Sequence, residues 1–522
     1  MTAILAPTPT RRRSLFWPGL MLITLALSQF SGDLVTATGW KWLTKLPKAW
    51  EPGFGKQISR AMKWLVEEAG IGPLSVQDIT RGVAAAIEAP YRLVRAGLID
   101  GFRTGIGQQA VELLPSAGWL TVVTCLALLG YRAGGLRLAA LVGTCFLYLV
   151  LFGQWQSAMV TLASVVIAVP LGVACGVALG IAAWRMVWIE RALRPMLDLM
   201  QTVPVFAYLV PILVLFGFGP VAALVATVIY AMPPMVRLTT LSLREVPPEV
   251  EEAGRMAGCT RRQLLWKVQL PTALPALMVG VNQVIMLSLN MVIIASMIGA
   301  GGLGYDVLAS LRRLDIGGGV EAGFAIVVMA VALDRLSQAL ARRSPGKGRW
   351  RQTLAAMLAI LVVAGLAGMV APWTLRFPET WQLSTGGFWA AVIGWINVNL
   401  HDMLEAGKIA LLKGLLVPVK TFFLGIPWPW GIALAALAAG RLGGRRLGLL
   451  AGSMTAFIAF SGLWPEAMMT LYLCGVSVLI AMALGVPLGL WAAASPRAGQ
   501  VIGLIIDTLQ TLPSFVYLIP VV

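Results

Sequence analysis

The sequence predicts an all-α polytopic membrane protein, and three observations support that fold class. First, 58% of its 522 residues are hydrophobic and only 12% are charged, against roughly 25% charged in an average soluble domain. Second, three long runs contain no charged residue or histidine: Leu199 to Val236, Val268 to Tyr305 and Ala467 to Pro496. A transmembrane helix needs about 20 mostly apolar residues, so each run is long enough to cross a bilayer. Third, basic residues gather at the ends of such runs.

The positions of the basic residues exclude one function class and set the sidedness of the chain. The formal net charge is +17, from 40 basic and 23 acidic residues, and such an excess can indicate nucleic-acid binding. Here the clusters flank apolar runs instead, which is the positive-inside pattern of cytoplasmic loops. They occupy residues 11–13, 185–194, 255–267 and 342–351. We therefore expect no nucleic-acid partner and a multi-pass protein of a bacterial inner (cytoplasmic) membrane.

Cysteine and histidine usage argues against a metal site or a catalytic centre. The five cysteines lie in apolar runs or in an expected cytoplasmic loop, and none forms a CxxC or another metal spacing. His401 is the only histidine. We expect no metal, no catalytic residue and no enzymatic activity in this chain.

Counting spans from a cytoplasmic N-terminus gives a consistent topology. The apolar stretch Ser14 to Phe30 follows three arginines and lacks a clear cleavage site, so we expect an uncleaved anchor. Residues 31–117 mix tryptophans with lysines, which is typical of amphipathic helices at the outer membrane surface. Residues 372–427 are similar in character. The expected spans are 118–131, 136–153, 157–184, 198–218, 220–236, 272–298, 322–340, 352–371, 428–440, 447–463 and 466–494, with a last one beginning near 503.

The chain contains an internal repeat. Residues 155–162 recur at 464–471, and residues 198–211 recur at 507–520 with eight of fourteen positions identical. Both pairs have the same offset in numbering (464 − 155 = 309 and 507 − 198 = 309). Shared Asp, Gln, Thr, Pro, Tyr and Trp in register exclude mere similarity of apolar composition. Because an even number of spans separates equivalent points, we expect a parallel tandem repeat about an axis along the membrane normal.

The repeat predicts the domain organisation. We expect an anchor with an amphipathic region over 1–117, a first permease domain over 118–345, a linker span with an amphipathic region over 346–427, and an incomplete second permease domain over 428–522. Val522 is equivalent to Leu213 of the first copy (522 − 309 = 213), far before the expected end of that copy. We interpret this as a C-terminal truncation.

One loop, residues 237–271, carries the strongest functional motif. It holds Glu-Ala-Gly, three residues, Gly, nine residues and then Val-Gln-Leu-Pro, and this spacing resembles the EAA motif of ABC-importer permeases, with Gly254 in place of the second Ala. Small residues permit close docking of a short helix on an ATPase, a glycine permits the turn, and a proline suits the first turn of the next span. The coupling residues we assign are Glu252, Ala253, Gly254, Gly258, Leu270 and Pro271.

Beyond that loop, the chain resembles permeases of the glycine betaine, proline betaine and choline importers over residues 150–345 and 462–522. The resemblance rests on stretches such as LDLMQTVP at 197–204, GVNQ at 280–283, MVIIASM at 291–297 and GGLG at 301–304. It implies a type I ABC importer fold and an osmoprotective substrate of the quaternary amine class. It also implies two copies of a cytoplasmic ATP-binding subunit, a periplasmic substrate-binding protein, and no directly bound cofactor, with ATP held by the partner.

Uncharged polar residues in two spans, and their counterparts in copy two, mark a candidate substrate path. Such residues either bond between helices or line a water-filled route, and for each one singly packing is the favoured role. We also expect Pro204 and Pro211 to break their helix. The uncharged runs around these residues hold no carboxylate for ion coupling, so energy coupling is expected at the cytoplasmic loop. The candidates are Gln201, Thr202, Pro204, Tyr208, Asn282, Gln283, Asn290, Gln510, Thr511 and Tyr517.

The sequence therefore predicts a permease subunit that couples ATPase motion to alternating access. One alternative is an ATP-independent secondary carrier or channel. Another is a non-functional permease fragment, since only one copy of the coupling loop is present in 522 residues.

Overall fold

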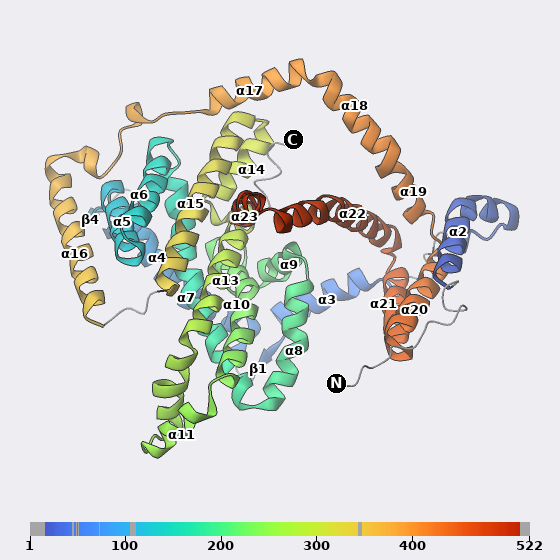
Figure 1. The fold of residues 1–522 in the computed structure, drawn as a ribbon, viewed down its shortest axis with the longest axis horizontal. Coiled ribbons are helices and arrows are strands. Elements are labelled where there is room, and N and C mark those ends of the chain that lie inside the picture. The colour runs from blue at the N-terminus through green and yellow to red at the C-terminus, as the bar shows by residue number, and fades with distance from the viewer. Residues whose placement is uncertain are drawn as a thin grey trace. The chain divides into compact units, whose positions relative to one another are not determined.

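The structure is a computed structural model, and it describes residues 16–43, 46–47, 50, 52–71, 74–104, 111–342 and 347–511. The chain divides into two compact units, one of residues 1–63 with 395–503 and the other of residues 64–394 with 504–522. Both are helical (Figure 1). Within the described ranges, six helices are long and apolar enough to cross a membrane, or up to eight spans if each of two bent helix pairs counts as one. The polytopic all-α prediction is confirmed.

The larger unit holds the first permease copy. Its helices are α4 (Val76–Arg95), α5 (Trp119–Gly134), α6 (Leu136–Leu151), α7 (Trp155–Arg185), α8 (Val187–Thr202), α9 (Val205–Phe216), α10 (Pro220–Arg244), α11 (Pro248–Met256), α12 (Arg261–Gln263), α13 (Leu270–Ala295), α14 (Leu303–Arg313), α15 (Ile316–Arg342) and α16 (Lys347–Val370). Two small antiparallel pairs precede α5, β1 (Gly70–Ile71) with β2 (Leu74–Ser75) and β3 (Phe102–Thr104) with β4 (Val111–Leu114). Helix α17 (Gly386–Asn399) follows.

The smaller unit joins the N-terminal helices to the second copy. It contains α2 (Phe16–Thr38), α3 (Phe54–Glu67, whose last turn enters the larger unit), α18 (His401–Leu411), α19 (Val417–Leu424), α20 (Trp428–Gly443), α21 (Arg445–Phe460), α22 (Trp464–Ala494) and most of α23 (Pro496–Thr511). Helix α2 is continuous over most of the expected anchor, but it is not one of the six span candidates. The uncleaved anchor stays a prediction.

The repeat is exact at the level of elements. Helices α20, α21, α22 and α23 have the bounds of α5, α6, α7 and α8, displaced along the chain by the offset of the sequence repeat. The turns repeat as well, because Gly135 and Gly444 both have positive φ (80° and 84°) and so do Gly153 and Gly462 (68° and 77°). Glycine suits these positions because it has no Cβ to clash in the left-handed region. The duplication predicted from the sequence is therefore a structural duplication.

Helices α7, α10 and α13 form the centre of the first copy and lie side by side (Figure 1). Glycines bring two of them into close contact. A Cβ built on Gly176 would lie 2.6 Å from Met235 Cβ, and one on Gly180 would lie 2.5 Å from Thr239 Cβ. Small residues at such crossings let helix backbones approach in a bilayer, where packing rather than water drives association. The α7–α10 contact is thus held by backbone proximity.

One expected span proves to be two helices. Residues 198–218 were expected to cross as one element, but α8 and α9 meet at 108° across the break at Val203 and Pro204. Val203 is extended (φ −69°, ψ 130°), as the residue before a proline prefers to be. Pro211, by contrast, lies inside α9 without ending it. The prediction of a break is right for Pro204 and wrong for Pro211.

Candidate functional site

The candidate coupling site is a helical hairpin that follows the C-terminal end of α10. Helix α11 begins with prolines at positions 247 and 248, where a missing N–H costs little. Its chain reverses at Gly258, whose φ of 78° favours glycine. The return arm opens with a capping box, in which Thr260 accepts from the Gln263 amide and the Gln263 side chain accepts from the Thr260 amide. The structure places Gly258 at the turn, as the motif predicts.

The inner face of the hairpin is a tight contact between its arms. Gly254 is buried, and a Cβ built there would lie 2.7 Å from Leu264 Cδ1 and 3.2 Å from Val268 Cγ2. Beside it, Gln269 is 3% exposed and donates from Nε2 to Glu251 Oε1 at 2.5 Å. A buried amide bonded to a carboxylate is a strong, charge-assisted link. The hairpin is therefore a preformed unit.

The outer face of α11 is open. Glu252 and Ala253 are exposed. Met256 is 85% exposed, and Trp266 on the return arm is 58% exposed. Flexible methionine side chains adapt well to a partner surface. An acidic residue beside small and apolar ones gives this face the chemistry of a docking surface.

The return arm places Pro271 where it is expected. Helix α13 begins at Leu270 with Pro271 in its first turn, although the helical backbone is continuous from Arg261 to Ala295. Residues Leu264–Gln269 form a π-helical turn just before α13. Such a widened turn commonly appears where the regular hydrogen-bond ladder is interrupted, and Pro271 removes one donor. Pro271 is exposed and Leu270 is half-buried. The return arm and the span are joined by continuous helical backbone.

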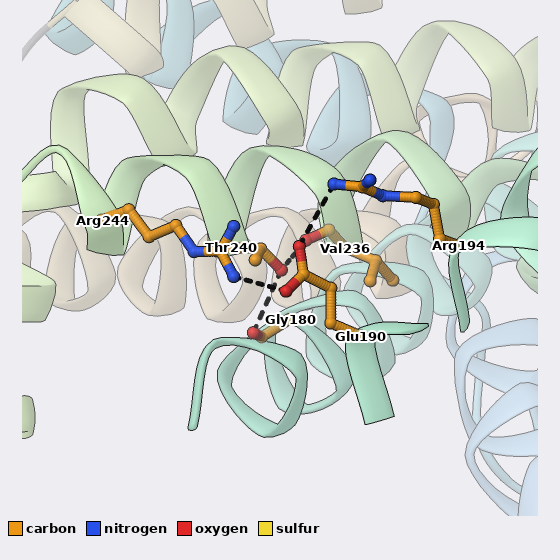
Figure 2. Close-up of polar contacts among 6 residues, drawn as sticks. All are labelled: Gly180, Glu190, Arg194, Val236, Thr240 and Arg244. Carbon is orange, nitrogen blue, oxygen red and sulfur yellow. Dashed lines mark hydrogen bonds and ion pairs between the residues drawn. The ribbon is translucent and has the colours of Figure 1, made fainter. Parts of the chain in front are cut away.

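A charged brace ties α8 to the end of α10, shortly before α11 begins. Arg244 donates to Glu190 Oε2 at 2.5 Å, and Arg194 lies 3.5 Å from Glu190 Oε1 (Figure 2). Next to this brace, the Thr240 hydroxyl contacts the Gly180 carbonyl of α7 at 3.2 Å and its own Val236 carbonyl at 2.9 Å. Three helices therefore converge where α10 leads into the hairpin.

The candidate pathway residues fall into two groups. Gln201, Thr202, Pro204 and Tyr208 surround the α8–α9 break, where the Tyr208 hydroxyl donates to the Met200 carbonyl across the break. The Thr202 hydroxyl donates to the Leu199 carbonyl at 3.1 Å, while Gln201 is exposed. This group is a structured bend with an exposed amide.

The second group lies on α13. Asn282 accepts a hydrogen bond from Ser337 of α15 at 2.8 Å, so it links two helices. Gln283 is exposed and Asn290 half-buried. Asn282 therefore has the packing role that we favoured for each of these residues, because its side chain bonds to a neighbouring helix. The side chains of the proposed counterparts Gln510, Thr511 and Tyr517 lie outside the described part of the chain.

Sequence reasoning missed three polar contacts. Glu251 and Gln269 close the hairpin, and Glu190 with Arg244 braces it. The third is Asp334 in α15, which is 3% exposed and accepts from Gln338 Nε2 at 2.8 Å. A charged pair at 334–335 within an apolar run was the available signal for it. The span packed against Asn282 therefore carries a buried carboxyl, although the uncharged runs 199–236 and 268–305 do not.

Comparisons with known proteins identify the family of the chain. The family described as binding-protein-dependent transport system inner membrane component matches residues 168–344, which include the hairpin. A trimethylamine N-oxide transport system permease protein from Ruegeria pomeroyi is 35% identical over 97% of this chain and 76% of its own length. A glycine betaine/proline betaine transport system permease protein from Escherichia coli is 38% identical over 60% of this chain and 87% of its own.

There are two further matches, one to a relative and one to a solved structure. A second trimethylamine N-oxide permease, from Pelagibacter ubique, is 34% identical over 87% of this chain, which spans 66% of that relative. A solved inward-facing methionine ABC transporter is 23% identical, covers 38% of this chain and 93% of its own, and has a TM-score of 0.30. The Ruegeria relative aligns across both copies of the repeat, so the fused arrangement is shared. The chain belongs to the inner membrane components of binding-protein-dependent transport systems, and is a multi-pass permease with the type I ABC importer fold.

Proposed function

We propose that this chain is the permease of an ATP-driven importer for small methylated amines of the betaine and trimethylamine N-oxide type. Its α11 hairpin docks on a cytoplasmic ATP-binding subunit, and a periplasmic binding protein delivers the substrate. The observation that carries the proposal is the hairpin itself, closed on its inner face by Gly254 and open on its outer face at Glu252, Ala253 and Met256.

The mechanism follows from the connections of the hairpin. It continues without a break into α13 and is joined to α10 by residues 245–247. A movement of the docked ATPase therefore acts on two central helices at once. The brace at Glu190 extends that movement to α8, and so to the break next to Gln201. Rocking of these helices would open the path alternately to each side.

The substrate class fits the path. The α8–α9 pair and α13 expose neutral amides at Gln201 and Gln283, and the runs around them, 199–236 and 268–305, hold no Asp, Glu, Lys, Arg or His. A net-neutral zwitterion needs no counter-ion in such a route, whereas a charged group is costly within a bilayer. Recognition of the methylated nitrogen then belongs to an aromatic cage in the binding protein.

The test is uptake by proteoliposomes that hold this chain, its ATPase and its binding protein. Glu252→Lys places a repulsive charge on the docking face, so we expect uptake to fall by more than about tenfold, as for an unpaired charge at an interface. Glu67→Lys, an exposed residue of α3 outside the motif and its connections, is the matched control and should keep uptake. Labelled trimethylamine N-oxide, glycine betaine and choline are compared in parallel.

The same assay separates the alternatives. Uptake that persists without ATP, or that is indifferent to Glu252→Lys, would identify a secondary carrier or channel. A folded, membrane-inserted complex with no uptake of any of the three substrates would contradict the proposed substrate class. Failure of the ATPase to copurify with the unsubstituted chain would favour the fragment hypothesis.

A further inference from the structure

A second repeat precedes each permease copy. Trp42, Pro47 and Trp50 recur as Trp373, Pro378 and Trp381, all at one offset in numbering (373 − 42 = 378 − 47 = 381 − 50 = 331). Basic and apolar positions between them match too, with Lys45 and Leu46 against Arg376 and Phe377. We call residues 16–50 and 347–381 the leading segments. The duplicated unit therefore begins before α5 and α20.

The two repeats are joined by connections of different length. The stretch from Trp64 to Trp119 in the first copy is longer than the equivalent stretch from Trp395 to Trp428 in the second. This difference accounts for the change of offset from 331 to 309, because 119 − 64 exceeds 428 − 395 by the same amount. The pair β3 and β4 lies in the longer connection. Each leading segment therefore precedes its own permease copy in the same order, and only the length of the connection between them differs.

Each leading segment packs on the other copy. In the smaller unit, the indole Nε1 of Trp428 donates to the Trp42 carbonyl at 2.8 Å. In the larger unit, the equivalent Trp119 donates to the Trp373 carbonyl at 2.9 Å. Trp428 and Trp119 are equivalent in the permease repeat, and Trp42 and Trp373 in the leading-segment repeat. The same hydrogen bond is made twice, both times between copies.

The apolar contacts around these bonds repeat as well. Phe377 meets the Trp119 ring edge to face, with centroids 5.4 Å apart. Its equivalent, Leu46, packs in the cluster of Trp428 and Ile426. Edge-to-face contact is an arrangement that aromatic rings prefer, because the positive ring edge meets the negative ring face. Both leading segments therefore fill the same site at the start of a permease domain.

The N-terminal helix makes further contacts with the second copy. Ser28 of α2 donates to the Phe422 carbonyl at 2.5 Å, and Trp430 donates to the Thr24 hydroxyl at 3.0 Å. The guanidinium of Arg441 lies 4.5 Å above the Phe16 ring. Helix α16 in turn packs against α5 of the first copy. The contact extends along each helix and is not limited to one tryptophan.

The chain passes between the units at equivalent places. The boundaries fall between Lys63 and Trp64 and between Gly394 and Trp395, which are equivalent positions in the leading-segment repeat. We propose that the two permease copies exchange their leading segments, so that each copy is completed by the segment that precedes the other. The start of each permease copy is thus covered by the leading segment of the other half of the same chain.

The exchange is tested by crosslinking the full chain in membranes. All five native cysteines are replaced, and a protease site is placed after Leu400, between α17 and α18. Leu46→Cys with Ile426→Cys reports the exchanged contact, and Phe377→Cys with Ile426→Cys reports the unexchanged one. After treatment with a short bis-maleimide and cleavage, a crosslinked chain stays at full length on a denaturing gel.

We expect the first pair to keep the chain at full length and the second pair to give at least about tenfold less, because such short bridges need neighbouring Cβ atoms. The reverse result would overturn the exchange. A product at twice the chain mass would show exchange between two chains and overturn the intrachain form.

Limited proteolysis gives a second measurement that needs no cysteine. Trp428→Phe removes the donor to Trp42, so cleavage within 39–53 should rise about fivefold, as for the loss of about 1 kcal/mol. Cleavage within 371–380 should not change. Trp119→Phe should give the opposite pattern. If each substitution instead exposed the leading segment that precedes its own copy, the proposal would be wrong.

Discussion

Asp306 shows how a half-buried carboxyl is held at the edge of the first copy. It lies in the first turn of α14, where Leu303 N–H donates to the Thr161 hydroxyl of α7 at 3.0 Å. Burial raises the pKa of Asp306 above its usual range, and a hydrogen bond with Ser157 only partly opposes this. Burial disfavours the charged form. At neutral pH this residue therefore lowers the stability of the fold.

Asp306→Asn should raise the melting temperature in detergent at pH 7 by about 1–2 °C. A carboxyl whose pKa is raised in the folded state favours folding fully only below its unfolded pKa, and this contribution is lost as pH rises through the folded value. The gain from Asn should therefore shrink towards zero as the pH falls to about 4. Thermal unfolding at a series of pH values measures it. A gain that grows on acidification would contradict the assignment.

Individual residues also limit what could be predicted. The spacing to Gly258 indicated the turn of the hairpin, whereas Gly254, expected to permit docking on an ATPase, is buried against Leu264 of the return arm. The sequence could not show which carboxylate accepts the hydrogen bond from Gln269, because Glu251 and Glu252 are adjacent. Only the fold shows that it is Glu251. Likewise, Pro204 and Pro211 look alike in sequence, and the surrounding backbone decides which one ends a helix.

At the scale of elements, α8 and α10 are joined by two ion pairs of different exposure. Glu190 is 18% exposed in its pair with Arg244, whereas Asp198 is 63% exposed in its pair with Arg237. Water and salt screen the more exposed pair, and exposed pairs typically contribute less than about 1 kcal/mol. The Glu190 pair is therefore the effective brace. Sequence could not pair these residues, because 54 positions separate Glu190 from Arg244.

A double-mutant cycle of Glu190→Gln and Arg244→Gln should give a favourable coupling in thermal unfolding, larger than the coupling of the more exposed pair. The matched cycle of Asp198→Asn and Arg237→Gln should give less than about 0.5 kcal/mol. Added salt should reduce the second value more strongly. Equal coupling in both cycles would show that burial of Glu190 does not strengthen its pair.

At the scale of the whole molecule, the sequence predicted most of the span order and the duplication with its constant offset. Both follow from apolar runs and matched polar positions, which can be read from the linear sequence without knowledge of the fold. The exchange of leading segments was not predicted, because packing partners far apart in the chain leave no local pattern. The break at Pro204 was predicted, but the 108° angle between α8 and α9 was not, since an apolar run with a proline reads the same at any angle.

Cys259 offers a direct test of the orientation. It lies in the α11 hairpin and is half-buried. In a variant that keeps only this cysteine, a membrane-impermeant maleimide should label it after permeabilisation but not in intact cells, because the positive-inside rule places the loop in the cytoplasm. Gly387→Cys, at an exposed position on the expected outer side, is the control and should react in intact cells. Labelling of Cys259 in intact cells would show that the loop lies outside and would contradict the expected topology.

The glycine contact between α7 and α10 has a mechanical consequence. At Gly176 and Gly180 the side chains of Met235 and Thr239 lie directly against the α7 backbone, so only a thin layer could absorb strain and α10 would tilt about this crossing like a lever. With 25 residues, α10 is about 37 Å long. A tilt of about 10° would sweep one end by about 6 Å relative to the other at 1.5 Å rise per residue. A displacement of that size is close to the width of a trimethylated nitrogen.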